Sequence, residues 1–212
     1  MYEIWKRIFD LSCASAVLII LGPFLLIVAV IIRLQDRGLS LYPAPRIGRN
    51  GVPFTMYKFR TMVVQADQIG ASSTADGDPR ITIVGRYLRR YKIDELPQFL
   101  NVLNGTMSLV GPRPQIQWAV DLYTLDQRHV LTVLPGITDY ASLYYSNLGE
   151  ILRGSSDPDG DYMRNIHPTK LRLSLRYVKE RSLVTDLKII FLTAFALVGA
   201  YRPTLPKDLE NI

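Results

Sequence analysis

Apolar residues are concentrated near the two ends of the chain. Residues 11–32, LSCASAVLIILGPFLLIVAVII, contain no charged side chain, and they are numerous enough for a helix to cross the roughly 30 Å hydrocarbon core of a bilayer. The second apolar stretch, residues 186–201, is shorter and carries Asp186 and Lys188 near its start. Its length favours a helix that is buried or lies in the membrane interface.

Gly22 and Pro23 lie in the middle of the long apolar run. Proline removes a backbone donor and clashes with the carbonyl four residues earlier, so the helix should bend or break there. Positive residues flank both ends of the run, namely Lys6, Arg7, Arg33 and Arg37. Because positive residues favour the cytoplasmic side, two arrangements fit: a re-entrant helix-break-helix hairpin with both ends in the cytoplasm, and a kinked spanning helix.

The middle of the chain begins with a predicted turn and strand in residues 48–62, GRNGVPFTMYKFRTM. Asn50-Gly51 is typical of a tight turn, and β-favouring residues then alternate with a period of two. This alternation places Lys58 and Arg60 on the same face of the strand.

A cationic helix is predicted over residues 84–91. Its apolar positions have helical spacing, and its other face carries Arg86, Arg89 and Arg90. A second helix is predicted to begin near Asp94, because Pro97 is tolerated in a first turn. Its apolar stripe consists of Leu96, Phe99, Leu100 and Leu103, and Gly105 is a natural end.

Two adjacent carboxylates, Asp94 and Glu95, therefore lie at a helix start beside many cations. One interpretation is structural: Asp94 caps the helix and Glu95 interacts favourably with its dipole. The other is chemical. The dipole and the arginines would hold both acids ionised, and an ionised carboxylate can act as a nucleophile or a Mg²⁺ ligand. Arg113, held between Pro112 and Pro114, could bind a phosphate or form an ordinary surface turn.

Charge adds a partner class to this picture. The chain has a formal net charge of +6, and residues 46–92 hold nine Lys/Arg against three Asp, which accounts for all of it. Such an excess fits an anion site or a solvated basic face, and its partners could be nucleic acid, an anionic membrane or phosphorylated substrates. The single cysteine, Cys13, excludes an internal disulfide and a CxxC metal site. No P-loop, GxGxxG or HExxH motif is present.

Several blocks of sequence together resemble the bacterial sugar transferases, the monotopic polyprenyl-phosphate phosphoglycosyl transferases. The blocks are the apolar segment with its central proline, FTMYKFRTM, DPRITIVGRYLRRYKIDELPQFLNVLNGTMSLVGPRP, LPGIT, and the terminal RYVKERSLVTDLKIIFLTA. The resemblance covers nearly the whole chain and matches the minimal catalytic form, without the extra N-terminal membrane helices of larger members.

This resemblance implies a mostly helical α+β fold. Residues 1–38 would form a re-entrant membrane hairpin broken at Gly22 and Pro23. Residues 39–212 would form a compact catalytic domain with a small β element and interfacial helices, on the cytoplasmic face of the bacterial inner membrane. The expected partners are a UDP-sugar, a polyprenyl phosphate and the membrane; a homodimer is compatible, and nucleic acid is not expected.

The resemblance also implies a reaction and its residues. Phosphosugar would move from the UDP-sugar to a lipid such as undecaprenyl phosphate, with release of UMP, as an early step of glycoconjugate synthesis. Asp94 would be the nucleophile that forms an acyl-phosphate intermediate, and Glu95 would help to place Mg²⁺, so that both acids are candidate metal ligands. The candidate phosphate-binding residues are Lys58, Arg60, Arg89 and Arg113. Asp186 falls in a matching C-terminal motif and is a further candidate site residue.

One departure limits what can be transferred. Many hexose-phosphate transferases of this group continue PGIT with a Gly-Trp-Ala-Gln pattern, whereas residues 139–152 here read DYASLYYSNLGEIL. We expect this segment to shape the nucleotide or sugar pocket, for a sugar that the sequence does not identify. Two rival functions fit the same residues: a membrane-anchored phosphatase or pyrophosphatase that uses the same acid, and a membrane-anchored adaptor or nucleic-acid binder built on the basic segment. The acid pair would repel nucleic-acid phosphates unless a metal intervened.

Overall fold

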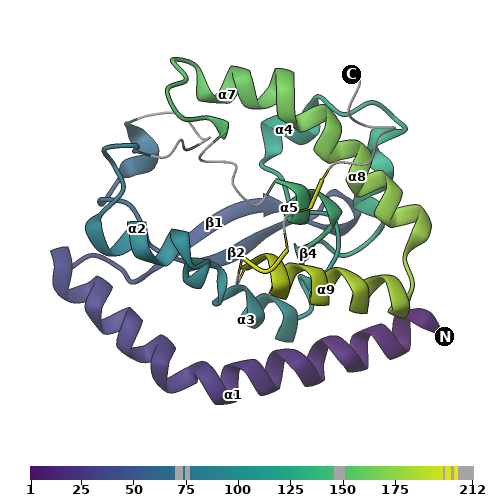
Figure 1. Cartoon of the computed structure of the whole chain (residues 1–212), viewed down its shortest axis with the longest axis horizontal. Helices are drawn as coiled ribbons and strands as arrows, with labels where there is room; N and C mark the ends of the chain where they lie inside the picture. Colours follow the sequence, from purple (N-terminus) through teal and green to yellow (C-terminus); the bar gives the residue numbers. More distant parts are fainter. Residues whose placement is uncertain (70–73, 75–76, 146–150, 198, 202, 205–212) are drawn as a thin grey trace.

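The computed structural model describes residues 1–69, 74, 77–145, 151–197, 199–201 and 203–204, and these are mostly helical, as predicted (Figure 1). The α-helices are α1 (Tyr2–Asp36), α2 (Ile83–Arg90), α3 (Gln98–Leu103), α4 (Gln117–Asp121), α5 (Tyr140–Tyr144), α7 (Pro158–Asp161), α8 (His167–Glu180) and α9 (Leu183–Leu197). The strands are β1 (Leu41–Ile47), β2 (Pro53–Phe59), β3 (Ser108–Val110) and β4 (Gly136–Thr138). Short 3₁₀ turns are η1 (Arg49–Gly51), η2 (Ala66–Gln68), η3 (Ile93–Glu95) and η4 (Gln127–Thr132), and η5 (Tyr162–Ile166) is π-helical.

Strands β1 and β2 form an antiparallel hairpin that pairs Leu41 with Phe59 at one end and Ile47 with Pro53 at the other. Its turn contains Asn50 in the left-handed region, at φ +59°, which confirms the predicted turn and strand. The partner strand β1 was not predicted. Prolines lie within it, and proline in a strand is an unfavourable signal that is tolerated at the edge of a sheet.

Strands β3 and β4 form a second, parallel pair that sequence patterns did not reveal. The backbones approach each other so closely that a Cβ on Gly136 would lie 2.1 Å from the amide nitrogen of Gly111. Glycine is therefore required at this crossing. The pair places the turn after Gly111 beside the start of α5.

Helix α1 is continuous through Pro23 and changes direction near its middle (Figure 1). Both of its halves contact the same body of the protein. Ala14 is buried in the first half, and Val28 and Ile32 are buried in the second. Between them the helix is open, and Ile19 is 77% exposed. The bend was expected from the proline, and the two-sided attachment was not.

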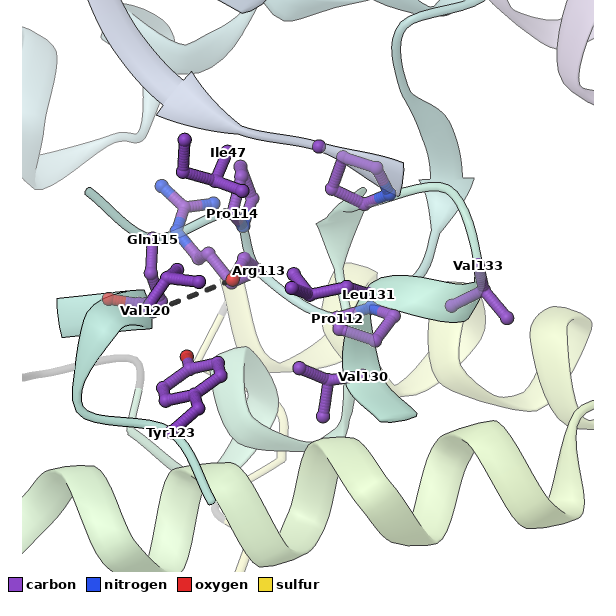
Figure 2. Close-up of a pocket in the computed structure, with 12 residues that line it drawn as sticks. Ile47, Pro112, Arg113, Pro114, Gln115, Val120, Tyr123, Val130, Leu131 and Val133 are labelled. Carbon is purple, nitrogen blue, oxygen red and sulfur yellow. Dashed lines mark hydrogen bonds between the residues drawn. The ribbon is translucent and has the colours of Figure 1, made fainter. Parts of the chain in front are cut away.

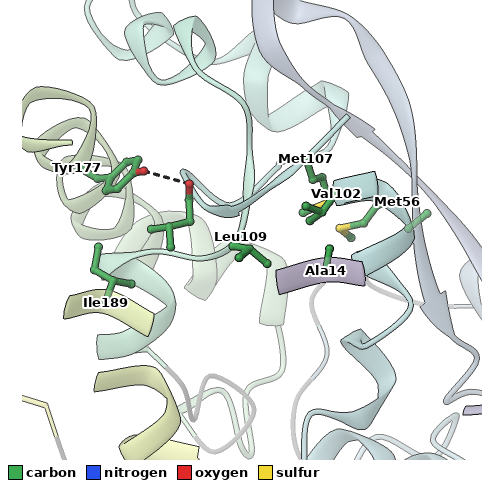
Figure 3. Close-up of a cluster of buried hydrophobic side chains, with 9 residues drawn as sticks. Ala14, Met56, Val102, Met107, Leu109, Tyr177 and Ile189 are labelled. Atoms are coloured by element: carbon green, nitrogen blue, oxygen red, sulfur yellow. Dashed lines mark hydrogen bonds between the residues drawn. The ribbon is translucent and has the colours of Figure 1, made fainter. Parts of the chain in front are cut away.

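The main hydrophobic core joins elements from the whole chain (Figure 3). It includes Ala14 of α1, Met56 of β2, Val102 of α3, Leu109 of β3, Tyr177 of α8 and Ile189 of α9. Buried Asn101 of α3 fastens that helix to β2, because its side chain accepts from the Tyr57 amide at 2.9 Å and donates to the Thr55 carbonyl at 2.7 Å. This attachment brings the residues just before α3 next to the end of β2.

Candidate active site

Asp94 and Glu95 lie in the 3₁₀ turn η3, directly before α3. Lys92 starts this turn in the left-handed conformation, at φ +56°. Asp94 is only 7% exposed, and its Oδ1 atom is buried and has no hydrogen-bond partner among the described residues. No side chain caps η3 or α3. The capping interpretation of Asp94 is therefore wrong, and a buried carboxylate oxygen without a partner needs another explanation.

Glu95, by contrast, is paired twice through one oxygen. Lys58 from β2 approaches Glu95 Oε1 with Nζ at 3.3 Å, and the Arg113 guanidinium donates to the same oxygen. Arg113 is also held from behind, because its Nη1 donates to the carbonyl of Ile137 at 3.0 Å. The structure thus brings together four of the residues that the sequence singled out: Lys58, Asp94, Glu95 and Arg113.

The two acids differ in their electrostatic surroundings. Burial and the negative charge of Glu95 raise the pKa of Asp94, and the cations Lys58, Arg89 and Lys92 offset this only in part. Burial opposes ionisation of Glu95 too, but the charges of Arg113 and Lys58 outweigh it and hold the Glu95 pKa well below its usual range. The expectation that the cations keep both acids fully ionised is thus supported for Glu95 and opposed by burial for Asp94.

The remaining predicted phosphate-binding residues, Arg89 and Arg60, differ in their contacts. Arg89 on α2 donates from Nε to Thr61 Oγ1 at 2.9 Å, and its charge acts on Asp94. Arg60 is turned elsewhere. Its guanidinium forms a two-pronged ion pair with Asp36 at the end of α1, and its Nε donates to the Leu39 carbonyl at 2.7 Å. Arg60 therefore fastens the C-terminal end of α1 in this structure.

Asp186 is also engaged outside the Asp94–Glu95 cluster. It is 1% exposed and accepts hydrogen bonds from Lys6 at 2.8 Å, from the Tyr2 hydroxyl at 3.0 Å and from the Tyr177 hydroxyl at 2.7 Å. These contacts tie the start of α1 to α8 and α9. Asp186 thus has a structural role as the shared, buried acceptor of these three side chains.

Magnesium was expected on Asp94 and Glu95. In the part of the chain that the structure describes, no group of three or more His, Cys, Asp or Glu residues is placed to hold a metal ion. The bare Oδ1 of Asp94 is nevertheless a fitting ligand atom. Mg²⁺ is often bound through one or two carboxylates together with substrate phosphates and water, so these two acids fit an ion that a phosphate substrate completes.

Two adjoining pockets lie beside Arg113. The first is lined by Ile47, Arg113, Gln115, Tyr123 and Val130 among others (Figure 2). The second continues from Arg113 and Tyr123 to a set of polar residues on α5 and α8, namely Ser142, His167, Lys170 and Ser174. These residues lie in ordinary amphipathic stretches, and only the tertiary fold collects them around the arginine. The second pocket includes Ala141 and Ser142 of the segment that was expected to shape a pocket, and residues 146–150 of that segment lie outside the described residues.

A model of the family described as bacterial sugar transferase matches residues 1–200 of the chain. The chain belongs to this family. The match confirms the resemblance seen in the sequence blocks, and it extends over the membrane-type helix, the carboxylate pair and both C-terminal helices.

Relatives of this sugar transferase include larger proteins. The undecaprenyl-phosphate glucose phosphotransferase of Komagataeibacter xylinus is 39% identical over 89% of this chain and 35% of the relative. The UDP-glucose:undecaprenyl-phosphate glucose-1-phosphate transferase of Escherichia coli (strain K12) is 36% identical over 90% of this chain and 39% of the relative. The exopolysaccharide production protein ExoY of Rhizobium meliloti (strain 1021) is 34% identical over 89% of this chain and 83% of its own length. The chain thus spans well under half of the first two relatives and most of the third.

Proposed function

We propose that this sugar transferase moves a sugar phosphate from a UDP-sugar to a polyprenyl phosphate such as undecaprenyl phosphate, with release of UMP. The product would be the polyprenyl-diphosphate sugar with which a bacterial O-antigen, capsule, exopolysaccharide or glycoprotein glycan begins. The observation that carries this proposal is the bare, buried carboxylate oxygen of Asp94 beside cations suited to phosphate. The names of the relatives support the same substrate classes.

Asp94 would act as the nucleophile. No described residue donates a hydrogen bond to its Oδ1, so no such bond has to be broken before this oxygen attacks. The oxygen would bond to the β-phosphorus of the donor while the bond from that phosphorus to the bridging oxygen breaks, and UMP would leave with the electron pair. An oxygen of the lipid phosphate would then attack the same phosphorus and release the Asp94 carboxylate.

The neighbouring charges would make an attack of one anion on another feasible. Glu95 would remain ionised and hold Lys58 and Arg113 in fixed positions, so that their positive charge is ready before the substrate arrives. Arg89 would contribute from α2, fixed by its bond to Thr61. A magnesium ion held by Asp94 and Glu95 would supply charge neutralisation on the phosphate oxygens.

The exposed apolar surface supports attachment to a membrane. Helix α1 is the one helix of the described residues that is long and apolar enough to cross a bilayer. Helix α9 also exposes apolar side chains, at Val184, Phe191 and Phe195. Because both halves of α1 contact the same protein body, we place residues 1–38 in one leaflet as a re-entrant helix bent at Gly22 and Pro23. Residues 39–212 would then lie on the cytoplasmic face of the inner membrane.

Release of UMP from a panel of UDP-sugars, measured with Mg²⁺ and undecaprenyl phosphate, tests the reaction. We expect continued release with at least one donor only when the lipid is present, about one UMP per enzyme with donor alone, and a loss of at least about a thousandfold for Asp94→Asn. Mass spectrometry of the wild type with donor alone should find a phosphosugar adduct on Asp94. Release of inorganic phosphate without the lipid would instead favour the phosphatase interpretation. Full activity of Asp94→Asn would contradict the assigned role.

Membrane topology needs a separate measurement. In a background with Cys13→Ser, single cysteines introduced at Met1 and Arg37 should both react with a membrane-impermeant thiol reagent added to inside-out vesicles. In right-side-out vesicles neither should react. If the two cysteines react from opposite sides of the membrane, the helix spans the bilayer and the re-entrant arrangement is refuted.

A further inference from the structure

The second pocket, between the turn after Gly111, α5 and α8, has its own set of polar groups. Its walls include Arg113, Gln115, Tyr123, Ser142, His167 and Lys170. It shares Arg113, Gln115 and Tyr123 with the pocket in Figure 2, where these three side chains surround a common space. Because Arg113 lines this pocket and also bonds to Glu95, the pocket adjoins the Asp94–Glu95 cluster.

Two buried polar atoms in this pocket lack a partner. His167 Nε2 and Ser142 Oγ form no hydrogen bond with any residue that the structure describes. The His167 ring is held between the rings of Tyr123 and Tyr162, with centroid distances of 5.7 Å and 5.9 Å. Buried polar groups are rarely left unsatisfied, so two of them in one pocket, one on α5 and one on α8, indicate a polar ligand.

The same pocket holds one cation, Lys170, that no acid pairs with among the described residues. Lys170 Nζ lies 5.6 Å from the ring centre of Tyr145 and 5.4 Å from that of Tyr162, and within the described ranges it forms no ion pair. Burial and the charge of Arg113 lower the Lys170 pKa to about 8. Burial and the charge of Arg113 therefore destabilise the charge of Lys170, and an anion bound between these two cations would relieve this.

Asp139 and Glu95 are the carboxylates whose charges act on Lys170. Glu95 is paired with Arg113 and Lys58. Asp139 is engaged by other groups. It is fully buried, it caps α5 by accepting from the Ser142 amide at 2.6 Å, and it accepts from the Ser174 hydroxyl at 3.1 Å. It forms no ion pair with Lys170 among the described contacts. Lys170 is consequently a cation of this pocket without an ion-pair partner among the described residues.

Resting on the proposed function, we infer that this pocket is a second phosphate subsite, in which Lys170 together with Arg113 holds the phosphate of the leaving nucleotide. Ser142 and His167 would bond to the hydroxyl-bearing group attached to that phosphate. Two phosphates take part in the reaction besides the transferred one: that of the nucleotide and that of the lipid. We assign the subsite to the nucleotide because its polar partners and tyrosine rings suit a nucleoside, whereas the polyprenyl chain must remain in the membrane.

Substitution of Lys170 distinguishes binding of the nucleotide phosphate from binding of the lipid phosphate. We expect Lys170→Met to raise the KM for the UDP-sugar and the inhibition constant of UMP about tenfold or more, because a charge-assisted hydrogen bond to phosphate is lost. The KM for undecaprenyl phosphate should stay within about twofold, and Lys170→Arg should restore most of the loss. Lys179→Met is the matched control, because Lys179 lies on α8 but is exposed.

A rise in the KM for the lipid alone would keep the phosphate subsite but overturn its assignment to the nucleotide. Unchanged constants for both substrates in a folded Lys170→Met protein would overturn the subsite. If Lys170→Met melts more than about 5 °C below the wild type, Ser142→Ala replaces it, with an expected loss of UMP affinity of about threefold to tenfold. Binding of UDP to the detergent-solubilised full chain, measured by calorimetry, tests the subsite without turnover. A wild type that binds UDP through Lys170 but releases no UMP would refute the proposed function and leave the subsite standing.

Discussion

Arg113 donates a hydrogen bond to Glu95 Oε1 from a turn that two prolines stiffen. The Ile137 carbonyl fixes the guanidinium from the other side, and Lys58 meets the same Glu95 oxygen. The acid therefore fixes two cations relative to each other, next to the bare oxygen of Asp94. Ordering the positive charge in advance reduces the reorganisation that the reaction would otherwise require.

Replacing this acid tests that arrangement. Glu95→Gln removes the charge that holds Lys58 and Arg113, and we expect kcat to fall about a hundredfold or more. The free energy of unfolding should fall by about 1–3 kcal/mol, because Lys58 and Arg113 lose the charged acceptor that they share in a largely buried position. Steady-state kinetics and urea unfolding in detergent measure the two effects. A variant that keeps its kcat would show that the two cations need no carboxylate between them.

The burial of Asp94 predicts an unusual effect on stability. Because the folded-state pKa of Asp94 is raised, the folded protein binds more protons than the unfolded chain between the ordinary aspartate value and the raised one, and stability falls as the pH rises through this window. Asp94→Asn has no carboxyl group to ionise and therefore avoids this loss of stability. We expect it to be more stable than the wild type at pH 7, by about 1–3 kcal/mol, while it is inactive.

The measurement is urea unfolding of both proteins at several pH values, with a chelator present so that bound metal does not contribute. The stability difference should shrink at low pH and vanish below about pH 3.9, the ordinary aspartate pKa, where the wild-type side chain is protonated in both states. An Asp94→Asn protein that is less stable than the wild type at pH 7 would mean that the charge is compensated in the fold.

Asp186 is predicted to act on stability and not on chemistry. Asp186→Ala leaves the ammonium of Lys6 and the hydroxyl of Tyr177 without their shared acceptor, which should cost about 3–5 kcal/mol. The folded fraction should keep its kcat. Glu3→Ala is the control, since the Glu3–Arg181 ion pair is largely exposed and should contribute less than about 1 kcal/mol. Limited proteolysis and active-site titration separate the two effects; a drop in kcat at full folding would return Asp186 to the catalytic residues.

Gly85 allows α2 to lie against the end of β2. A Cβ at this position would lie 1.9 Å from the carbonyl oxygen of Thr61, so Gly85→Ala must push α2 away. Arg89 lies on α2 and would move with it, which would lengthen or break its hydrogen bond to Thr61. We expect a loss of about 1–3 kcal/mol in stability and a rise of about tenfold in the KM for the UDP-sugar. Tyr87→Phe on the exposed face of α2 should behave as the wild type in both melting and kinetic assays.

Local patterns predicted the elements whose cause is local. The proline in α1, the Asn50 turn with its strand, and the amphipathic spacing of α2 each depend on a few neighbouring residues, and each is present. Strand β1 was missed because its prolines mask it, and β3–β4 because their pairing joins distant segments. Helix α3 begins at Gln98, later than predicted, since a 3₁₀ turn carries the acids first.

The candidate site shows the same division. Lys58, Asp94, Glu95 and Arg113, which the sequence singled out, lie in one cluster, whereas Arg60 pairs with Asp36 although the strand pattern put it on the same face as Lys58. The pKa of Asp94 is raised mainly by burial, and this burial depends on the packing of the whole fold. Lys170 lies in an ordinary helix, and only the pocket around Arg113 distinguishes it.

The attachment of both halves of α1 to the folded body has a practical consequence for protein production. Ala14, Val28 and Ile32 of this helix fill the interior, so a fragment that begins after it would expose the surfaces these residues cover and would aggregate. A water-soluble version is better obtained by keeping the helix and replacing only its outward-facing side chains, such as Ile19 and Ile27, with polar ones.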